Sequence, residues 1–373
     1  MRINLDLFSL VVFISSLIYF CILAWIRLGL NRLTAPGTDQ TPFISVIVAA
    51  RNEEAYISKL LTALLLQNYP RDRFEVIIID DQSSDATASL VRSHKDERIH
   101  LIQTTDHDKV TSPKKHALHL GIENAKGEFI FLTDADCLPG KEWLHGMIRL
   151  FDQQIGMVIG FSPSELPKLV TMSDYLLALE SLSLAAIAAG TTGWGFAATC
   201  NGRNLAYRKC VYKQVGGFSR IAQFISGDDD LFLKLVQQTE WKIRYAFDER
   251  LIVPTQRSSG FMHFVHQRLR HASKGFYYDQ NKVIALIFVY FYNLAILSTL
   301  PLALITGHSP LVPLVAIGLK FIADFILLFG FASRMRRKKI LWSFLPAELL
   351  HLPYVVLFGA LGPFLNFKWK ESK

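Results

Sequence analysis

Long apolar runs constrain this chain more than any other feature of its sequence. Residues 7–26 and 283–305 form runs of 20 and 23 residues without a charge. A helix needs ~20 apolar residues to cross the hydrocarbon core of a bilayer. The first run ends in Trp25-Ile26-Arg27 instead of a small-residue cleavage site, which favours an uncleaved anchor within residues 1–30 over a signal peptide. We therefore predict an integral membrane protein.

Two further apolar runs near the C-terminus contain charged residues. Residues 311–331 include Lys320 and Asp324, one helical turn apart, and residues 341–361 include Glu348. Charges at membrane depth usually face the interior of a helix bundle and pair with one another. Either they line a polar path for a polymer or a lipid head group, or they form an ion pair that fixes helix packing. We expect about three spans within residues 283–363.

Basic residues between the last two spans predict the orientation. Residues 333–340 contain five Lys and Arg residues, whereas residues 306–310 contain none. Because cytoplasmic loops are enriched in Lys and Arg, the basic loop is predicted to be cytoplasmic, and counting back places residues 27–282 there too. The expected location is the cell (inner) membrane. The tail, residues 364–373, then lies outside, which its three lysines oppose.

Between the anchor and the later spans, residues 43–260 alternate short apolar runs with helical patterns, after a linker at residues 31–42. The predicted strands are residues 44–50, 74–79, 99–103 and 128–132, and the predicted helices are residues 57–66, 86–93 and 114–125. Strands that alternate with helices indicate an α/β fold with a doubly wound, mostly parallel sheet.

Composition excludes several classes of protein. Hydrophobic residues make up 51% of the 373 residues and charged residues 19%, with a net charge of +8. These values are incompatible with disorder, a collagen-like repeat or a small disulfide scaffold. The four cysteines, Cys21, Cys137, Cys200 and Cys210, have no CxxC spacing and are expected to be reduced thiols. The basic excess lies beside the predicted spans, which indicates an anionic membrane face and not nucleic acid.

Acidic residues follow the predicted strands. Asp81 follows the second strand, and Asp134 and Asp136 follow the fourth. In open parallel sheets the carboxyl ends of the strands form the ligand crevice, so these carboxylates are expected to converge. Two carboxylates at this spacing suit a hard divalent cation that shares diphosphate oxygens. Lys114 or Lys115 would place a positive charge near such a diphosphate. The sequence has neither a GxGxxG nor a P-loop motif.

Three other segments carry polar groups. Residues 226–231 place Asp228, Asp229 and Asp230 after a glycine and before a helical run, which suits a general base. Residues 199–208 offer small and amide side chains that would line a polar substrate channel. Residues 261–282 mix basic and aromatic residues directly before a span, which indicates an interfacial helix.

Taken in chain order, these segments resemble the membrane-bound glycosyltransferases of family 2, which have a GT-A fold and include cellulose, hyaluronan and poly-N-acetylglucosamine synthases. The similar segments are the first strand at residues 45–53, the base-binding loop at 80–85, a Lys-x-x-Ala-Leu-Asn-x-Gly segment at 114–121, the DxD at 134–136, and the acceptor segment at 202–208. The third match selects Lys114 over Lys115, although His119 replaces its Asn.

Two motifs depart from the family pattern. Glu-Asp-x-Asp-Leu becomes Gly227-Asp228-Asp229-Asp230-Leu231, where the spacing favours Asp228 as the base, while relatives with Gly-Asp-Asp favour Asp229. Gln-x-x-Arg-Trp becomes residues 267–271, in which His271 replaces the Trp. This replacement weakens the inference of processive synthesis but leaves the inference of sugar transfer intact.

The resemblance implies inverting transfer from a nucleotide-diphosphate sugar to a hydroxyl of a polysaccharide or lipid-linked acceptor at the cytoplasmic face. It implies Asp228, or else Asp229, as the base and Mg²⁺ or Mn²⁺ bound by Asp136 and Asp134. The implied donor-binding residues are Ala50, Arg51, Glu53, Asp81, Lys114, Asp134, Gln267 and Arg270. The implied acceptor-binding residues are Cys200, Asn201, Gly202, Asn204 and His271.

Two alternatives come from other classes of protein. A phosphohydrolase of the haloacid-dehalogenase type also has a DxD after a strand, but there the motif ends the first strand and Asp81 would have no role. A non-catalytic membrane subunit that binds nucleotide or polymer would not need every expected carboxylate.

Overall fold

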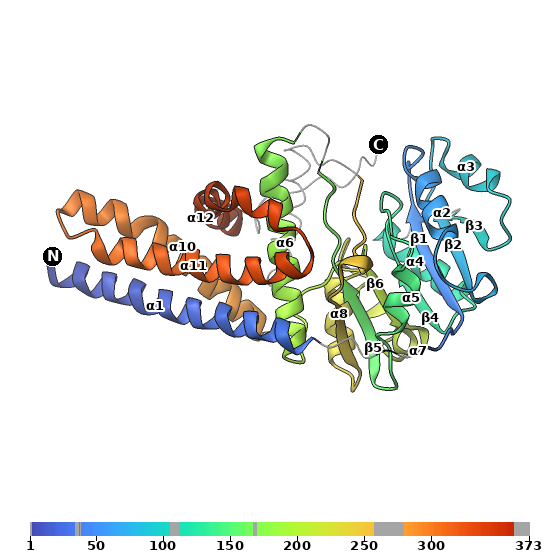
Figure 1. Cartoon of the computed structure of the whole chain (residues 1–373), viewed down its shortest axis with the longest axis horizontal. Helices are drawn as coiled ribbons and strands as arrows, with labels where there is room; N and C mark the ends of the chain where they lie inside the picture. The colour runs from blue at the N-terminus through green and yellow to red at the C-terminus, as the bar shows by residue number, and fades with distance from the viewer. Residues whose placement is uncertain are drawn as a thin grey trace. The chain divides into compact units, whose positions relative to one another are not determined.

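The computed structural model describes residues 2–33, 37, 39–104, 112–166, 170–256 and 280–361 (Figure 1). The chain forms two compact units. Helices predominate in the unit built from Met1–Leu28, Leu166–Leu182 and Ser258–Lys373, and the sheet lies in the unit built from Gly29–Glu165 and Ser183–Arg257. Most of the predicted interfacial helix, with Gln267, Arg270 and His271, and the tail at residues 364–373 lie outside the described residues.

The sheet has seven strands in the order β3-β2-β1-β4-β6-β5-β7. Their bounds are β1 Ile44–Ala50, β2 Phe74–Asp80, β3 Ile99–Gln103, β4 Phe129–Leu132, β5 Ile155–Gly160, β6 Leu205–Arg208 and β7 Lys242–Ala246. All pairs are parallel except those that β6 makes with β4 and β5. The predicted mostly parallel sheet is confirmed, and the first four strands lie where the apolar runs placed them.

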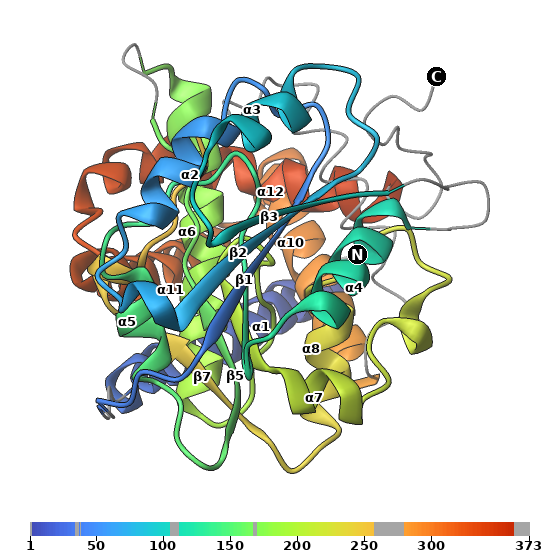
Figure 2. The same ribbon diagram turned by 90° about the vertical axis from the view of Figure 1, so that its right-hand side faces the viewer.

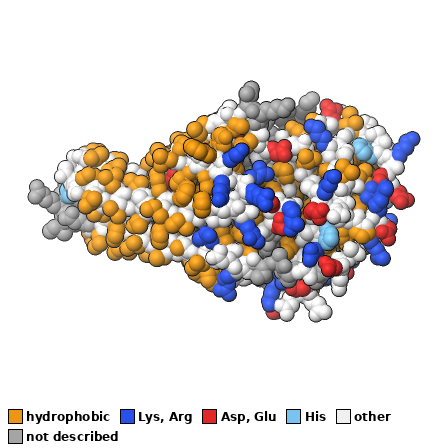
Figure 3. All heavy atoms as spheres, viewed as in Figure 1, with side chains coloured by type: hydrophobic (Ala, Val, Ile, Leu, Met, Phe, Trp, Pro, Cys, Tyr) orange, Lys and Arg blue, Asp and Glu red, His pale blue; other side chains and the backbone are white. Residues whose placement is uncertain are grey.

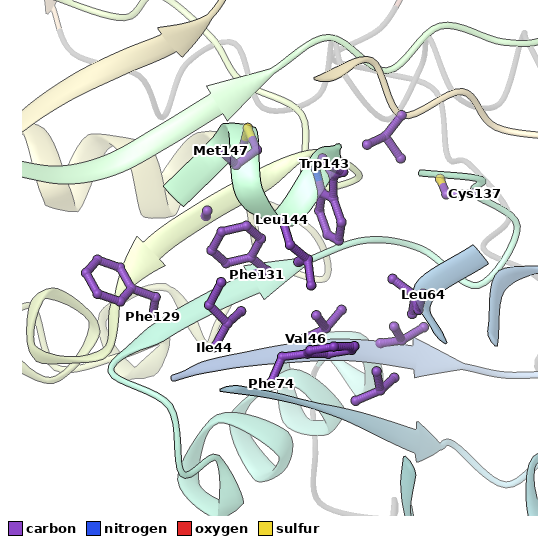
Figure 4. Packing of buried hydrophobic residues seen from close by; sticks show 14 of the residues in the cluster. Ile44, Val46, Leu64, Phe74, Phe129, Phe131, Cys137, Trp143, Leu144 and Met147 are labelled. Carbon is purple, nitrogen blue, oxygen red and sulfur yellow. The ribbon is translucent and has the colours of Figure 1, made fainter. Parts of the chain in front are cut away.

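Helices cover both faces of the sheet (Figure 2). Helices α2 (Ile57–Leu65) and α5 (Trp143–Ile148) pack on one face, where Val46, Phe74 and Trp143 belong to one buried cluster (Figure 4). Helix α4 (Pro113–Asn124) packs on the other face. Its Gly121 permits this close packing, because a Cβ there would lie 2.5 Å from a side-chain carbon of Ile79. Burial on both faces explains why β1 and β2 are apolar apart from Ser45, Glu75 and Asp80.

Three shorter helices complete this unit. They are α3 (Thr87–Ser93), α7 (Lys209–Gln214) and α8 (Asp230–Gln237). Helix α8 begins directly after the Gly227–Asp229 turn, so the predicted acidic motif forms its N-terminal end.

The helical unit contains four long helices that match the predicted spans. They are α1 (Arg2–Gly29), α10 (Gln280–Thr306), α11 (Leu311–Arg334) and α12 (Phe344–Leu361). Each contributes to a segment that is long and apolar enough to cross a membrane. Hydrophobic side chains gather on the visible surface of α1, α10 and α11 (Figure 3), and those of Leu10, Phe291 and Leu314 are more than half exposed. Lipid contact would bury such side chains without cost.

A fifth helix, α6 (Met172–Gly193), also meets the length and composition of a span and was not predicted from the sequence. The chain enters α6 after β5 and leaves it before β6, and these two strands are paired. A single crossing by α6 would place β5 and β6 on opposite sides of a bilayer, which their hydrogen bonds forbid. Helix α6 therefore does not act as a single span.

The charged residues of the predicted spans pair with each other inside the helical unit. Lys320 has no exposed surface, and its ammonium lies 2.8 Å from Oδ2 of Asp324 and also contacts Oε1 of Glu348. The hydroxyl of Tyr19 donates to Oδ1 of Asp324 at 2.7 Å. These contacts join α1, α11 and α12, and they favour the interpretation that the ion pair fixes helix packing.

Candidate active site

The sheet topology brings the predicted site segments to one edge. Strands β1, β2 and β4 are parallel, so their carboxyl ends lie together, and antiparallel β6 begins at the same edge. Across this edge lie, in order, Asp81 after β2, Arg51 after β1, Asp134 and Asp136 after β4, and the residues 199–204 that precede β6. Residues far apart in the sequence therefore lie at the edge of the sheet at which open α/β proteins bind ligands.

At the β2 side of this edge, Asp81 is held at both its backbone and its side chain. Its amide donates to the carbonyl of Ala50 at 2.8 Å, and the Thr104 hydroxyl donates to its Oδ1 at 3.3 Å. Its Oδ2 lies 3.9 Å from the guanidinium of Arg51, whose side chain is 41% exposed. A carboxylate and a cation are thus presented side by side. The contact of Thr104 with Asp81 was not predicted, because no motif near Thr104 in the sequence indicates a functional residue.

The loops after β1 and β2 lock together. Asn52 and Gln82 both have left-handed backbones, with φ of 54° and 56°. The amide of Asn52 donates to Oγ of Ser83, and its Oδ1 accepts from the amide of Ser84, both at 2.9 Å. The amide of Glu53, a buried residue, donates to Oγ1 of Thr87 at 2.8 Å. Asn52 was not predicted, although Asn is the residue type that best tolerates this backbone conformation apart from glycine.

Lys114 joins the DxD to the acidic motif. Its Nζ lies 3.0 Å from Oδ1 of Asp134 and 3.1 Å from Oδ2 of Asp228. Burial lowers the pKa of the Lys114 ammonium, but the two carboxylates outweigh burial and raise this pKa above its ordinary value. The lysine is therefore positively charged at neutral pH and lies between the two predicted functional carboxylates.

Lys115, the other lysine that the sequence offered, has a different environment. It is 3% exposed, and its Nζ donates to the carbonyls of Ile221 and Phe224, both at 2.5 Å. Ser112, which caps α4, donates from Oγ to the carbonyl of Ile225 at 2.7 Å. The start of α4 thus holds the segment that leads to Asp228. This role was not predicted, since the sequence does not reveal which backbone a lysine contacts.

The three consecutive aspartates have different partners. Oδ1 of Asp229 accepts from the amide of Asp230 at 2.7 Å, and its Oδ2 accepts from the amide of Gly202 at 3.3 Å. Oδ1 of Asp230 accepts from the Thr199 hydroxyl at 2.8 Å and from the amide of Cys200 at 3.0 Å. Asp228 instead faces Lys114. Asp229 and Asp230 therefore tether the predicted acceptor segment to the start of α8.

Within that segment, Cys200 and Gly202 lie beside the aspartates. Asn204, which was predicted to bind the acceptor, has a different environment. Asn204 is fully buried, its Oδ1 accepts from Nε1 of Trp143 at 2.9 Å, and its Nδ2 donates to the carbonyls of Phe161 and Leu251. With every side-chain group used, it has nothing to offer an acceptor. The prediction of acceptor binding by Asn204 is corrected: it ties β6 to the core. Oδ1 of Asn201 accepts from the amide and Nε of Arg203.

The DxD residues provide a partial donor set for a hard cation. Asp134 and Asp136 are both partly exposed, and among the described residues no group of three or more His, Cys, Asp and Glu side chains could hold a metal ion. Mg²⁺ and Mn²⁺ favour oxygen ligands, and Mg²⁺ takes about six. Two carboxylates fit an ion that takes its remaining ligands from a diphosphate and water, and they fit a permanently bound ion poorly.

Comparisons with protein families match this arrangement. The model of glycosyl transferase family 2 matches residues 45–209, and that of glycosyl transferase family group 2 matches residues 129–360. The second match covers more than half of the chain and extends from β4 into α12.

Individual relatives are also glycosyltransferases by name. The probable glycosyltransferase YdaM of Bacillus subtilis is 29% identical over 202 residues, which are 52% of this chain and 47% of that protein. The beta-monoglucosyldiacylglycerol synthase of Trichormus variabilis is 36% identical over 113 residues, which are 30% of this chain and 24% of that protein. The matched regions thus span less than half the length of these relatives.

A solved structure shares the fold. The mannosyltransferase PcManGT of Pyrobaculum calidifontis, solved with GDP-Man and Mn²⁺, superimposes with a TM-score of 0.62 at 20% identity, over 93% of this chain and 99% of that one. This likeness establishes the GT-A fold.

Proposed function

This chain belongs to glycosyl transferase family 2 and is a glycosyltransferase, and from that premise we propose that it transfers a sugar, with inversion, from a nucleotide-diphosphate sugar to an acceptor hydroxyl. The acceptor is a polysaccharide or a lipid-linked glycan, and transfer takes place at the cytoplasmic face of the cell membrane. One observation carries this proposal: Lys114 contacts both Asp134 of the DxD and Asp228 of the acidic motif.

The donor lies along the edge of the sheet. Asp81 and the Ala50–Glu53 turn hold the nucleoside, because they follow β2 and β1, and Asp134 and Asp136 lie beside the diphosphate after β4. The positive charge of Lys114 stabilises the negative charge that grows on the departing diphosphate. A bound Mg²⁺ or Mn²⁺ supplies further neutralisation of that charge.

Asp228 is the proposed base. Its carboxylate takes the proton of the acceptor hydroxyl while the hydroxyl oxygen attacks the anomeric carbon, and the bond from that carbon to the diphosphate breaks with both electrons leaving on the diphosphate. The proton ends on Asp228. Asp229 is a poorer choice, because backbone amides already occupy both of its oxygens. A positioned base contributes ~10²–10⁴-fold to such a rate.

The membrane placement follows from α1, α10, α11 and α12 as four spans. With the basic loop after α11 on the cytoplasmic side, the sheet unit is cytoplasmic and meets soluble nucleotide sugars there.

The test is incubation of the purified full chain with a panel of nucleotide sugars, Mg²⁺ or Mn²⁺, and glycan and lipid acceptors, followed by sizing of the products. A ladder of products indicates polymer synthesis, and one added sugar indicates single transfer. If no nucleotide sugar is bound or consumed, the proposal is wrong.

A further inference from the structure

A cationic side chain, Arg203, lies on the acceptor side of the site. The edge places the nucleoside residues after β2 and β1 and the DxD after β4, so the residues that precede β6 lie beyond the diphosphate. Arg203 belongs to this last segment, next to Gly202, whose amide is held by Asp229. The sequence marked the surrounding segment as polar, but Arg203 itself received no role.

The guanidinium of Arg203 is fixed by neutral groups. Its Nε donates to Oδ1 of Asn201 at 3.2 Å, and its Nη2 donates to the carbonyl of Ser162 at 3.1 Å. In the part of the chain that the structure describes, Arg203 forms no ion pair with a carboxylate and Nη1 makes no hydrogen bond. Other half-buried arginines of this unit, such as Arg208 and Arg244, have Glu128 and Asp152 as partners. The guanidinium of Arg203 is therefore fixed in position, with no carboxylate partner among the described residues.

Hydrogen bonds place this charge beside the segment that follows the DxD. Arg203 holds the carbonyl of Ser162, and the carbonyl of the next residue, Pro163, accepts from the amide of Thr255 at 2.9 Å. Thr255 is in turn paired with Cys137, the residue that follows the DxD.

Two buried polar side-chain atoms near Arg203 form no hydrogen bond within the described residues. Oγ of Ser162, whose carbonyl holds Arg203, and Nε2 of Gln256 have no hydrogen-bond partner within the described ranges. The amide of Gln256 donates to the carbonyl of Asp136 at 2.8 Å, which places it beside the DxD. Buried polar groups in native proteins are nearly always satisfied, so these two atoms beside the DxD can bond a water molecule or a ligand.

We propose that Arg203 binds an oxyanion of the acceptor, so that the enzyme prefers acceptors that carry a phosphate or a carboxylate near the reacting hydroxyl. The planar guanidinium matches both groups through two parallel N–H donors, which a lysine does not provide. This inference rests on the proposed sugar transfer and narrows its acceptor class.

The experiment uses the full chain with the nucleotide sugar that the panel identifies. Three acceptors are compared: a glucosyl phosphate, a uronic-acid glycoside, and the matched neutral glucoside, all of which offer sugar hydroxyls. The first two separate phosphate from carboxylate as the source of the oxyanion. For the parent chain we expect a higher kcat/KM with one of the charged acceptors than with the neutral one.

Arg203→Gln should raise KM for the preferred charged acceptor roughly 10- to 100-fold, the size of a lost charge-assisted hydrogen bond, and leave the neutral acceptor and donor hydrolysis unchanged. Arg203→Lys should fall in between. Arg73→Gln is the matched control, since Arg73 is 55% exposed and precedes β2 at the opposite edge of the sheet. Thermal unfolding checks that each variant is folded.

Several results would overturn the proposal. They are equal use of charged and neutral acceptors by the parent, use of neither while the donor is hydrolysed, and equal losses with both acceptors in Arg203→Gln. A higher KM for the donor in that variant would assign Arg203 to the diphosphate instead. A parent chain that neither binds nor hydrolyses any nucleotide sugar would refute the proposed sugar transfer itself.

Discussion

Nζ of Lys114 lies 3.1 Å from Oδ2 of Asp228, and the neighbouring Asp229 has both carboxylate oxygens occupied by backbone amides. The two aspartates are consecutive in the chain, yet only Asp228 turns toward the DxD through a shared lysine. This difference separates a residue available for proton transfer from one that holds the loop.

The first prediction compares these two residues. Asp228→Asn should lower kcat by ~10²–10⁴-fold, because the amide cannot take a proton, with donor affinity nearly unchanged. Asp229→Asn should mainly lower the melting temperature, because it weakens the N-terminal end of α8 and the tether to Gly202. Rates and calorimetric donor binding measure both. A fully active Asp228→Asn beside a folded but inactive Asp229→Asn would move the base by one residue.

A second prediction concerns the metal. Asp136→Asn should weaken binding of the nucleotide sugar in the presence of Mn²⁺, and chelation of the metal should reduce the parent to the same affinity. Asp72→Asn is the control, since Asp72 has an 81% exposed side chain and precedes β2 at the opposite edge. Donor titration with and without chelator gives the answer. If neither the Asp136→Asn substitution nor chelation changes the affinity for the donor, Asp136 does not bind the metal.

A third prediction tests Lys115 as a positioning residue. Lys115→Met removes both hydrogen bonds to the segment before Asp228 and should lower kcat while KM for the donor stays constant. Lys115→Arg should recover part of the loss. Lys126→Met, at a 71% exposed side chain, is the control. If Lys115→Met instead raises the donor KM with kcat unchanged, the lysine serves the donor and not the base.

A fourth prediction concerns the buried charges of the helical unit. Lys320→Met leaves Asp324 and Glu348 without their shared cation and should cost about 3–5 kcal/mol, as for other broken buried ion pairs. Thermal unfolding in detergent measures the loss. Replacing all three residues by apolar ones should restore stability, because no buried charge remains. A triple variant that is stable but no longer transfers sugar would favour the polar path over the packing interpretation.

The sequence predicted one half of the sheet closely and the other half poorly. Strands β1, β2 and β4 are largely apolar runs buried on both faces, and β3 is a partly buried run at the edge of the sheet, so their local pattern reveals them. The antiparallel β6 is a short run whose direction depends on its partners β4 and β5, and no local pattern encodes that. Helix α6 was not predicted, although its length and composition alone meet those of a span.

The sequence likewise predicted some residues of the candidate site and misjudged others. Residue type and spacing alone pointed to Asp81, Asp134 and Asp136, because the carboxyl ends of parallel strands converge at the ligand crevice, and to the 228–230 aspartates, because such a cluster suits a general base. The family resemblance selected Lys114, whose contacts with Asp134 and Asp228 agree with that choice. Asn204 was misjudged because an amide in a polar segment looks the same in sequence whether it faces a ligand or the core.

By itself, the sequence determined which segments are apolar enough for membranes or for a buried sheet, and which carboxylates follow strands. Only the tertiary structure shows the different partners of consecutive residues, namely of Lys114 and Lys115, of Asp228 and Asp229, and of Arg203 and Asn204. The physical reason is that hydrophobic periodicity is a local property of the chain, whereas the partner of a polar side chain comes from a distant segment. The local sequence pattern therefore predicts which segments are buried, but it does not predict which groups form hydrogen bonds at the site.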